Sequence, residues 1–211
     1  MPKTASYLIC ILVVTSPGFA QRSISFHVGA NIANLSNPGN LVSSATWYSR
    51  VGIVGGVSVT FPVSTNLAVE PGFRFVQKGT KSKWSYLSKD DVQSTLTNSY
   101  LELPVYLKYQ LADFGSRLWV QGGPTISYLL SSWAKGTMSS FGEFSFDVID
   151  DYRRYDASLD FGIVLDNPLS SDWELSLGAL YSLGLVKINK SDSNEKTRDI
   201  RLMVGISYLL D

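Results

Sequence analysis

The residue best suited to acid–base chemistry in this sequence is its single histidine, His27, which has Ser25 and Asn31 nearby at even spacing. A histidine can activate a serine for acyl transfer or proteolysis when a carboxylate orients its imidazole. No sequence motif places a nucleophile and a carboxylate together with His27. We therefore expect an ordinary histidine in the protein interior or at its rim, no catalytic residues, and a protein that is not an enzyme.

Three aspartates could gather a hard cation such as Ca²⁺, whose preferred ligands are carboxylate oxygens. They lie in the stretch FGEFSFDVIDDYRR, as Asp147, Asp150 and Asp151, next to Arg153 and Arg154. Their spacing differs from that of a calcium-binding loop. The sequence also lacks phosphate-binding glycine loops and histidine or cysteine pairs at metal-ligand spacing, so we expect a solvated loop, no metal site and no cofactor.

A basic stretch, KGTKSKWSYLSKDD, spans residues 78–91 and includes Trp84 and Tyr86. Lysines of this kind can bind phosphate groups, so the stretch could contact lipopolysaccharide or a partner protein. The alternative is an exposed loop with some surface packing. The whole chain has 18 basic and 18 acidic residues, and this balance gives no reason to expect a nucleic acid as partner.

The first 20 residues have the features of a secretory signal peptide. Lys3 supplies a positive charge, residues 7–14 are apolar, and Gly18 and Ala20 suit signal peptidase. We expect cleavage after Ala20, which leaves a barrel domain over residues 21–211. Cleavage would also remove Cys10, the only cysteine in the chain, so no disulfide is expected.

The rest of the chain alternates between apolar and polar residues with a period of two, which is typical of β-strands. Each alternating segment is at least as long as the ~9–11 residues that a tilted strand needs to cross a bilayer. Eight such segments can be defined: Ser23–Leu35, Trp47–Val63, Asn66–Gly79, Ser99–Leu111, Arg117–Ser132, Arg154–Asp166, Asp172–Lys187 and Asp199–Leu210.

The connections between these segments alternate in length. Short turns follow the second, fourth and sixth segments, whereas longer connections span residues 36–46, 80–98, 133–153 and 188–198. Short turns at one end and long loops at the other are typical of outer-membrane barrels, with the short turns on the periplasmic side. We therefore expect all-β structure, as an eight-stranded antiparallel up-and-down transmembrane β-barrel in the bacterial outer membrane.

The polar faces of the segments decide between this barrel and a soluble one. In Asp172–Lys187 and Arg117–Ser132 those faces carry mainly small and weakly polar residues, whereas a soluble exterior is rich in Lys and Glu. The apolar faces should therefore contact lipid, with aromatic residues near both boundaries. Phe26, Phe61, Tyr109, Trp173 and Tyr208 fall near the periplasmic end, and Trp47, Phe75 and Tyr155 near the other.

Charged residues on the inward faces must then be paired, because an isolated charge in a dry lumen is costly. We expect a contact between Glu70 and Lys108, which lie on neighbouring segments. Pro104 shares the inward face and cannot donate a ladder hydrogen bond, so a bulge or local irregularity is expected there. The inward charges are Arg50, Glu70, Arg74, Lys78, Glu102, Lys108, Asp156, Asp160, Glu174, Asp199 and Arg201.

Four motifs occur in order along the chain: FHVGANIANLS, VEPGFRFVQKG, YLELPVYLKY and VQGGPTISYLL. Together they resemble the PorT-like outer-membrane β-barrel proteins of Bacteroidota over essentially the whole mature chain. The resemblance implies an eight-stranded outer-membrane barrel without catalytic residues. One departure is the C-terminal SYLLD, where Tyr208 is the nearest aromatic residue, since outer-membrane proteins usually end in an aromatic.

Two functions remain open. The first is a structural or interaction protein that displays its long loops to outer-membrane lipid, lipopolysaccharide, or another surface or secretion protein. The alternative is a narrow channel for small solutes or ions. An eight-stranded lumen is only wide enough for its own side chains, so the first is favoured.

Overall fold

The computed structural model describes residues 22–36, 45–86, 90–140, 142–190 and 194–210. The expected signal peptide lies outside these residues and stays a prediction. Among the described residues, no helix is long and apolar enough to cross a membrane. The elements are β1 (Arg22–Ser36), β2 (Thr46–Ser64), β3 (Leu67–Tyr86), β4 (Asp90–Asp113), β5 (Arg117–Met138), β6 (Gly142–Asp147), the 3-10 helix η1 (Ile149–Asp151), β7 (Tyr155–Pro168), β8 (Trp173–Gly184) and β9 (Lys196–Leu210).

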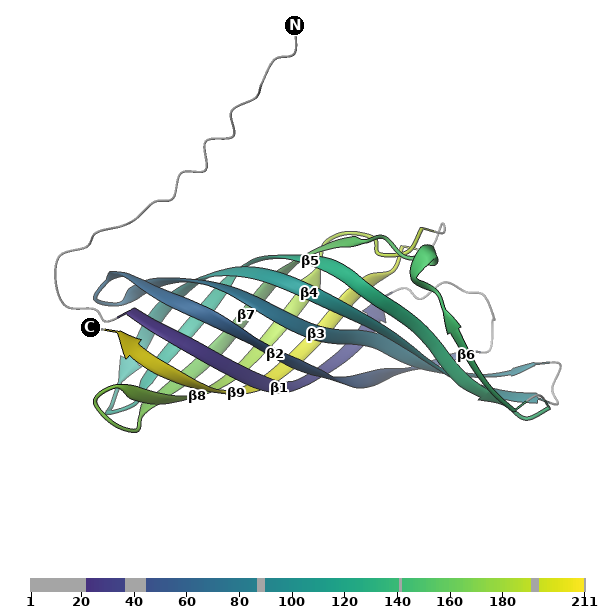
Figure 1. Cartoon of the computed structure of the whole chain (residues 1–211), viewed down its shortest axis with the longest axis horizontal. Coiled ribbons are helices and arrows are strands. Elements are labelled where there is room, and N and C mark those ends of the chain that lie inside the picture. Colours follow the sequence, from purple (N-terminus) through teal and green to yellow (C-terminus); the bar gives the residue numbers. More distant parts are fainter. Residues whose placement is uncertain (1–21, 37–44, 87–89, 141, 191–193, 211) are drawn as a thin grey trace, which may run out of the picture.

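Eight of the strands close into a ring of antiparallel neighbours, as Figure 1 shows. Each pairs with the next along the chain, except that β5 pairs with β7, and β9 returns to pair with β1 over its whole length. The predicted eight-stranded up-and-down barrel is therefore confirmed. The alternating pattern requires this closure, because a strand whose outer face contacts lipid cannot leave a row of backbone groups unpaired.

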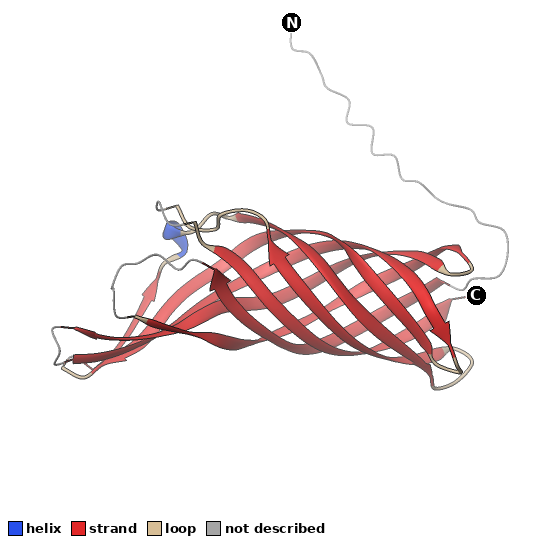
Figure 2. Ribbon diagram, turned by 180° about the vertical axis from the view of Figure 1, so that it is seen from behind, coloured by secondary structure: helices blue, strands red, loops and turns tan. Residues whose placement is uncertain are grey.

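The long connections contain more regular structure than the sequence indicated. The stretches 80–98 and 133–153 were expected to be loops, but β3, β4 and β5 continue through much of them, and β6 adds a ninth strand outside the ring. These extensions form a sheet beyond the barrel rim, visible in Figures 1 and 2 at the end away from the described termini. We call it the projecting sheet; it comprises residues 46–49, 80–86, 90–97, 133–138 and 142–147.

The outward faces of the barrel strands are apolar and exposed, as expected of a surface that contacts lipid. Ile163 in the middle of β7 is 53% exposed. At the end with the short turns, the rings of Trp173 and Tyr208 lie 5.0 Å apart on neighbouring strands. Tyr155, at the other end, is exposed. Two bands of aromatic residues therefore border an aliphatic surface, which is the arrangement of a membrane-spanning barrel.

Of the bulge or local irregularity predicted at Pro104, the structure shows the irregularity: pairing is interrupted next to Pro104 on both sides of β4, without a bulge. The β3–β4 register is the same on both sides of it, although the ladder passes from Pro71↔Val105 to Arg74↔Glu102 without pairing the residues between them. Gly72 makes room for the proline, because a Cβ on Gly72 would lie 3.3 Å from the Pro104 ring. The register shifts of β4 occur instead at Ser99/Tyr100 and Gln110/Ala112, against β5.

Gly123, in the stretch VQGGPTISYLL, is needed for the close packing of two neighbouring strands. A Cβ on Gly123 would lie 2.0 Å from the backbone oxygen of Val105 on the neighbouring strand. A side chain at this position is incompatible with the observed approach of β4 and β5, since real Cβ atoms do not come so close to a backbone atom.

The lipid-facing surface leads to a prediction. Replacing Ile163 by arginine should destabilise the protein in lipid vesicles by ~2–4 kcal/mol, because the charge would enter the hydrocarbon region. The same replacement by arginine at the exposed Phe146 of β6, beyond the rim, should change the stability of the protein little. Urea unfolding of both variants in the same vesicles measures the difference, and an equal loss of stability in the two would contradict the assignment of the lipid-facing surface.

Candidate functional site

The interior of the barrel contains a buried layer of paired charges, which we call the charge layer. Its members come from β3, β4, β7 and β9, and each is at most 2% exposed. They project inward because they occupy alternate positions of their strands. The charge layer consists of Arg74, Lys78, Glu102, Asp156, Asp160, Asp199 and Arg201.

Each cation of the charge layer contacts at least two carboxylates. Arg74 bridges Glu102 and Asp160, with Nη2 at 2.8 and 3.0 Å from their oxygens. Lys78 Nζ lies 3.0 Å from Glu102, and Arg201 Nη1 lies 3.1 Å from the same carboxylate. A buried charge without a partner is strongly destabilising: removing one partner of a buried ion pair typically costs ~3–5 kcal/mol of stability. Several carboxylates around each cation therefore stabilise it in the lumen.

Hydroxyl groups add further hydrogen bonds to the acids. Tyr106 donates a hydrogen bond of 2.5 Å to Asp160, and Thr125 donates one of 2.9 Å to the same oxygen. Thr197 donates to Asp156 at 3.2 Å. These donors come from β4, β5 and β9, so the charge layer joins strands that lie across the barrel as well as direct neighbours.

The predicted contact between Glu70 and Lys108 is confirmed. Lys108 Nζ donates to Glu70 at 2.9 Å, and Thr60 donates to the same carboxylate oxygen at 2.9 Å. The two residues are not directly opposite, because Lys108 is in register with Ala68 and Glu70 with Tyr106. The contact is therefore a diagonal one, which long side chains can make across two strands.

An apolar cluster closes the lumen at the end of the long loops. Tyr152 follows η1, and burial raises the pKa of its hydroxyl. The backbone N–H of Arg153 donates to the oxygen of Ile188 at 2.7 Å, which holds the β8–β9 connection against the mouth. The cluster consists of Leu35, Val54, Val76, Tyr100, Leu129, Tyr152 and Ile188, and it excludes water from that end of the charge layer.

The other end of the lumen is open. A polar vestibule of about 610 Å³ lies between the short turns, with Arg117 paired to Glu174 on its wall. Its inner limit is Lys108, beyond which a pocket of about 50 Å³ remains between the vestibule and the charge layer. The interior is thus accessible from the end with the short turns and closed at the end with the long loops.

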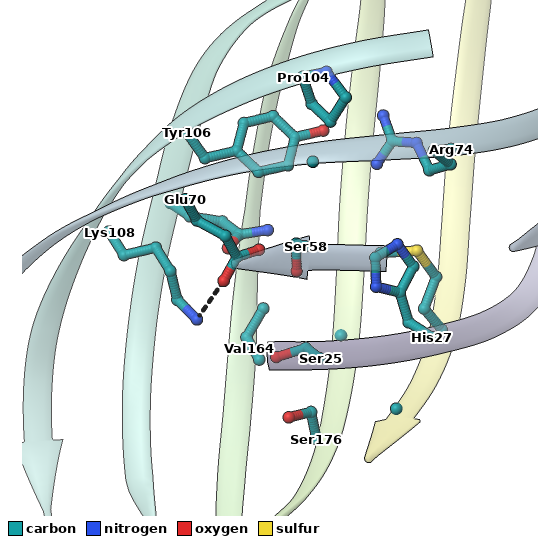
Figure 3. Close-up of a pocket in the computed structure, with 15 residues that line it drawn as sticks. Ser25, His27, Ser58, Glu70, Arg74, Pro104, Tyr106, Lys108, Val164 and Ser176 are labelled. Atoms are coloured by element: carbon teal, nitrogen blue, oxygen red, sulfur yellow. Dashed lines mark hydrogen bonds and ion pairs between the residues drawn. The ribbon is translucent and has the colours of Figure 1, made fainter. Parts of the chain in front are cut away.

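His27 lines this small pocket together with Ser25, Ser58 and Glu70, as Figure 3 shows. The Glu70 carboxylate is already bound by Lys108 and Thr60. A space of about 50 Å³ accommodates a few water molecules and is far smaller than a typical substrate pocket. A serine, a carboxylate and a histidine therefore lie near one another without forming a catalytic arrangement.

The three aspartates that could have bound a cation lie around η1. The Asp147 carboxylate accepts a hydrogen bond of 2.9 Å from the backbone N–H of Ile149, while Asp150 and Asp151 are in η1 itself. In the described part of the chain, no group of three acidic, histidine or cysteine side chains is placed to hold a metal ion.

The basic stretch 78–91 is divided between two environments. Lys78 belongs to the buried charge layer, whereas Lys81 and Lys83 are exposed on the projecting sheet. Trp84 is half-buried, and the side chain of Tyr86 lies outside the described residues. Sequence reasoning missed Lys135, which shares a face of the projecting sheet with Lys81, because the two residues are 54 positions apart in the chain.

The Glu70–Lys108 contact can be tested by charge exchange. Reversing either residue alone, as Glu70→Lys or Lys108→Glu, should impair folding because two like charges would meet in the lumen. The double exchange should restore much of the loss. Yield of folded protein and urea unfolding measure this, and a double variant no better than the singles would show that the contact contributes nothing.

Comparison with solved structures supports the barrel fold. OprG from Pseudomonas aeruginosa has a TM-score of 0.55 at 12% identity, covering 90% of this chain and 96% of that one. The outer-membrane protease OmpT from Escherichia coli has a TM-score of 0.51 at 9% identity, covering 90% and 97%. At these identities the likeness concerns the fold alone.

A comparison with curated proteins found no match. The family model for the outer membrane protein beta-barrel domain matches residues 19–190, which is most of the chain. The closed ring, the lipid-facing exterior and the charged interior agree with it, and so this chain belongs to the outer membrane protein beta-barrel domain family.

Proposed function

We propose that this outer-membrane barrel is a non-enzymatic interaction protein that presents the projecting sheet to a partner at the cell surface. The sheet itself is the observation that carries the proposal. Residues that a barrel does not need for crossing the membrane are organised into five hydrogen-bonded strands beyond the rim. Such an ordered extension is a rigid platform for recognition.

The register of the projecting sheet is continuous across all five strands. One row runs from Tyr48 through Lys81, Thr95 and Lys135 to Ser145. Within the described residues, its last strand, β6, pairs with β5 alone and so has a free edge. Free strand edges are common attachment sites for an extended segment of a partner.

The side chains of β6 differ between its two faces. Phe144 and Phe146 stack on one face, with ring centroids 5.6 Å apart, whereas Glu143 and Asp147 lie on the other. A strand with one apolar and one acidic face suits a partner strand of alternating apolar and basic residues.

The alternative function, a narrow channel, is less favoured by the geometry. Any solute would have to displace the ion pairs of the charge layer and then pass the apolar cluster at the outer end. Each step has a high cost, because the charges are buried and paired with one another and the apolar side chains are buried and packed together. The His27 pocket is likewise too small to support an enzymatic reading.

We also propose a finer family placement. The motifs VEPGFRFVQKG and YLELPVYLKY support membership of the PorT-like proteins of Bacteroidota, within the broader family. Those stretches contain Arg74, Lys78 and Glu102, three members of the charge layer. We therefore interpret the resemblance as a shared way of filling the lumen, without extending the secretion role of any relative to this chain.

The display role can be tested in intact cells with a photo-crosslinking residue introduced at Ser145 on the free edge. We expect a discrete crosslinked product with a surface component. The matched control is the same residue at Ile163 on the lipid-facing surface, where only lipid should react. Absence of any product at Ser145, and at Phe146 and Thr137 of the same sheet, would argue against the display role.

Channel activity is tested separately by reconstitution in planar bilayers. We expect no stable, reproducible conductance from the purified protein, because the charge layer and the apolar cluster close the lumen. A large porin in the same bilayers serves as positive control. Reproducible pores from this protein would favour the channel instead.

A further inference from the structure

The outer face of the projecting sheet carries three lysines close together, and we call this group the lysine face: Lys81, Lys83 and Lys135. Lys81 and Lys135 both lie opposite Thr95, on the two sides of β4. Lys83 is two residues beyond Lys81 on the same face of β3. From the rise per residue and the spacing of strands, the Cα atom of Lys81 lies about 7 Å from that of Lys83 and about 10 Å from that of Lys135.

The lysine face continues the lipid-facing exterior of the barrel. β4 keeps strict alternation from Gln93 to Leu103, so Gln93 and Thr95 are on the same side as the exposed Leu103. Lys81 and Lys83, which pair with Thr95 and Gln93, are therefore on that side too. This side of the sheet is therefore continuous with the lipid-facing side of the barrel and faces away from the lumen.

Two aromatic residues accompany the lysines. Lys83 Nζ lies 6.0 Å from the centre of the Tyr48 ring, and Lys135 Nζ lies 5.9 Å from the centre of the Trp133 ring. Tyr48 and Trp133 are exposed. Exposed Tyr and Trp beyond an aliphatic surface are typical of the membrane–water boundary, which places the lysines at the level of lipid headgroups.

The ammonium groups of the lysine face are available to a ligand. All three lysines are exposed, and none forms an ion pair with another side chain in the described part of the protein. Gln93, Thr95 and Thr137 lie between them and add polar groups. Among the residues whose side chains the structure describes, the acids Glu143 and Asp147 share this face, on β6 beside Lys135, and so they limit the site on that side.

We propose that the lysine face binds the phosphate groups of lipopolysaccharide in the outer leaflet. Phosphates on a glycolipid headgroup offer the charge that three neighbouring ammonium groups require, and lysine is a common phosphate ligand. Tyr48 and Trp133 lie where the sugar and acyl portions of the same molecule meet. The site does not depend on the display role, since a lipid bound at this face leaves the free edge of β6 accessible.

The distribution of other charges agrees with this ligand. Besides the lysine face, the exposed bases at the same end of the barrel include Arg153, Arg154, Lys190 and Arg198, and together they outnumber the exposed acids Glu143, Asp147, Asp150 and Asp151. The opposite end exposes Arg22, Asp113 and Asp172. The end that faces the phosphate-bearing leaflet is thus the basic one. The arginines belong to the rim around β7 and β9, away from the lysine face, and so they provide a matched control.

The experiment measures binding of purified lipopolysaccharide to the full-length protein in detergent. The test variant combines Lys81→Gln, Lys83→Gln and Lys135→Gln, and the control combines Arg153→Gln, Arg154→Gln and Arg198→Gln. We expect the lysine variant to bind about tenfold or more weakly, because charge-assisted contacts to phosphate are lost. The arginine variant, with the same change in net charge, should bind nearly as the wild type does.

Two further arms identify the ligand. Dephosphorylated lipopolysaccharide should bind weakly to wild type and lysine variant alike, and vesicles of phosphatidylglycerol should compete poorly. Equal binding by the two variants, undiminished binding of the dephosphorylated glycolipid, or full competition by phosphatidylglycerol would each overturn the proposal. Circular dichroism and protease resistance establish that both variants are folded. In the lysine variant, loss of lipopolysaccharide binding with crosslinking retained at Phe146, on the opposite face of the sheet, would separate this site from the display role.

Discussion

The structure depends on the pairing of opposite charges inside a barrel that is too narrow to hydrate them. Eight strands leave room only for their own side chains, and this chain fills that room with Arg74, Lys78 and Arg201 against four carboxylates. None of these charges could remain there alone, because desolvation would exceed any single attraction. Their shared partners tie β3, β4, β7 and β9 together through the interior, while the backbone ladders tie them together around the circumference.

This interior explains why the two ends of the protein differ. Towards the short turns, the lumen opens into a vestibule with charged walls that water can solvate. Towards the long loops, an apolar cluster around Tyr152 and Ile188 covers the charge layer. The cover keeps the local dielectric low, which strengthens each ion pair beneath it. Closure of the lumen and stability of the charge layer are therefore the same feature, and it is this feature that disfavours transport.

With the interior closed, the parts of the chain that are free to recognise other molecules lie outside the barrel. β3, β4 and β5 extend past the rim, where Lys81 and Lys135 share one face with exposed aromatics and β6 supplies a free edge. The two surfaces are separate, since one is a side-chain face towards the membrane and the other a backbone edge. A lipid contact and a protein contact can thus coexist on the same small sheet.

The alternation of residues was enough to predict the barrel, its eight strands and the direction of the side chains within the barrel wall, because strand periodicity is a local property of the chain. Trp47, expected on the lipid-facing side, is an exception: the register shift between Ser49 and Val54 turns it to the side of Ser82. It was also enough to predict that Glu70 meets Lys108, since neighbouring antiparallel strands leave few choices of partner. Local pattern could not predict that residues 133–153 contain β6, because polar and short apolar stretches form strands only when a neighbour supplies hydrogen bonds. Nor could it predict that Gly72, on another strand, makes room for the ring of Pro104. The sequence by itself thus determined the architecture and the inward or outward side of the residues in the barrel wall. The tertiary structure alone decided which distant residues meet, such as Arg74 with Asp160 or Lys81 with Lys135, because those contacts depend on register around a closed ring.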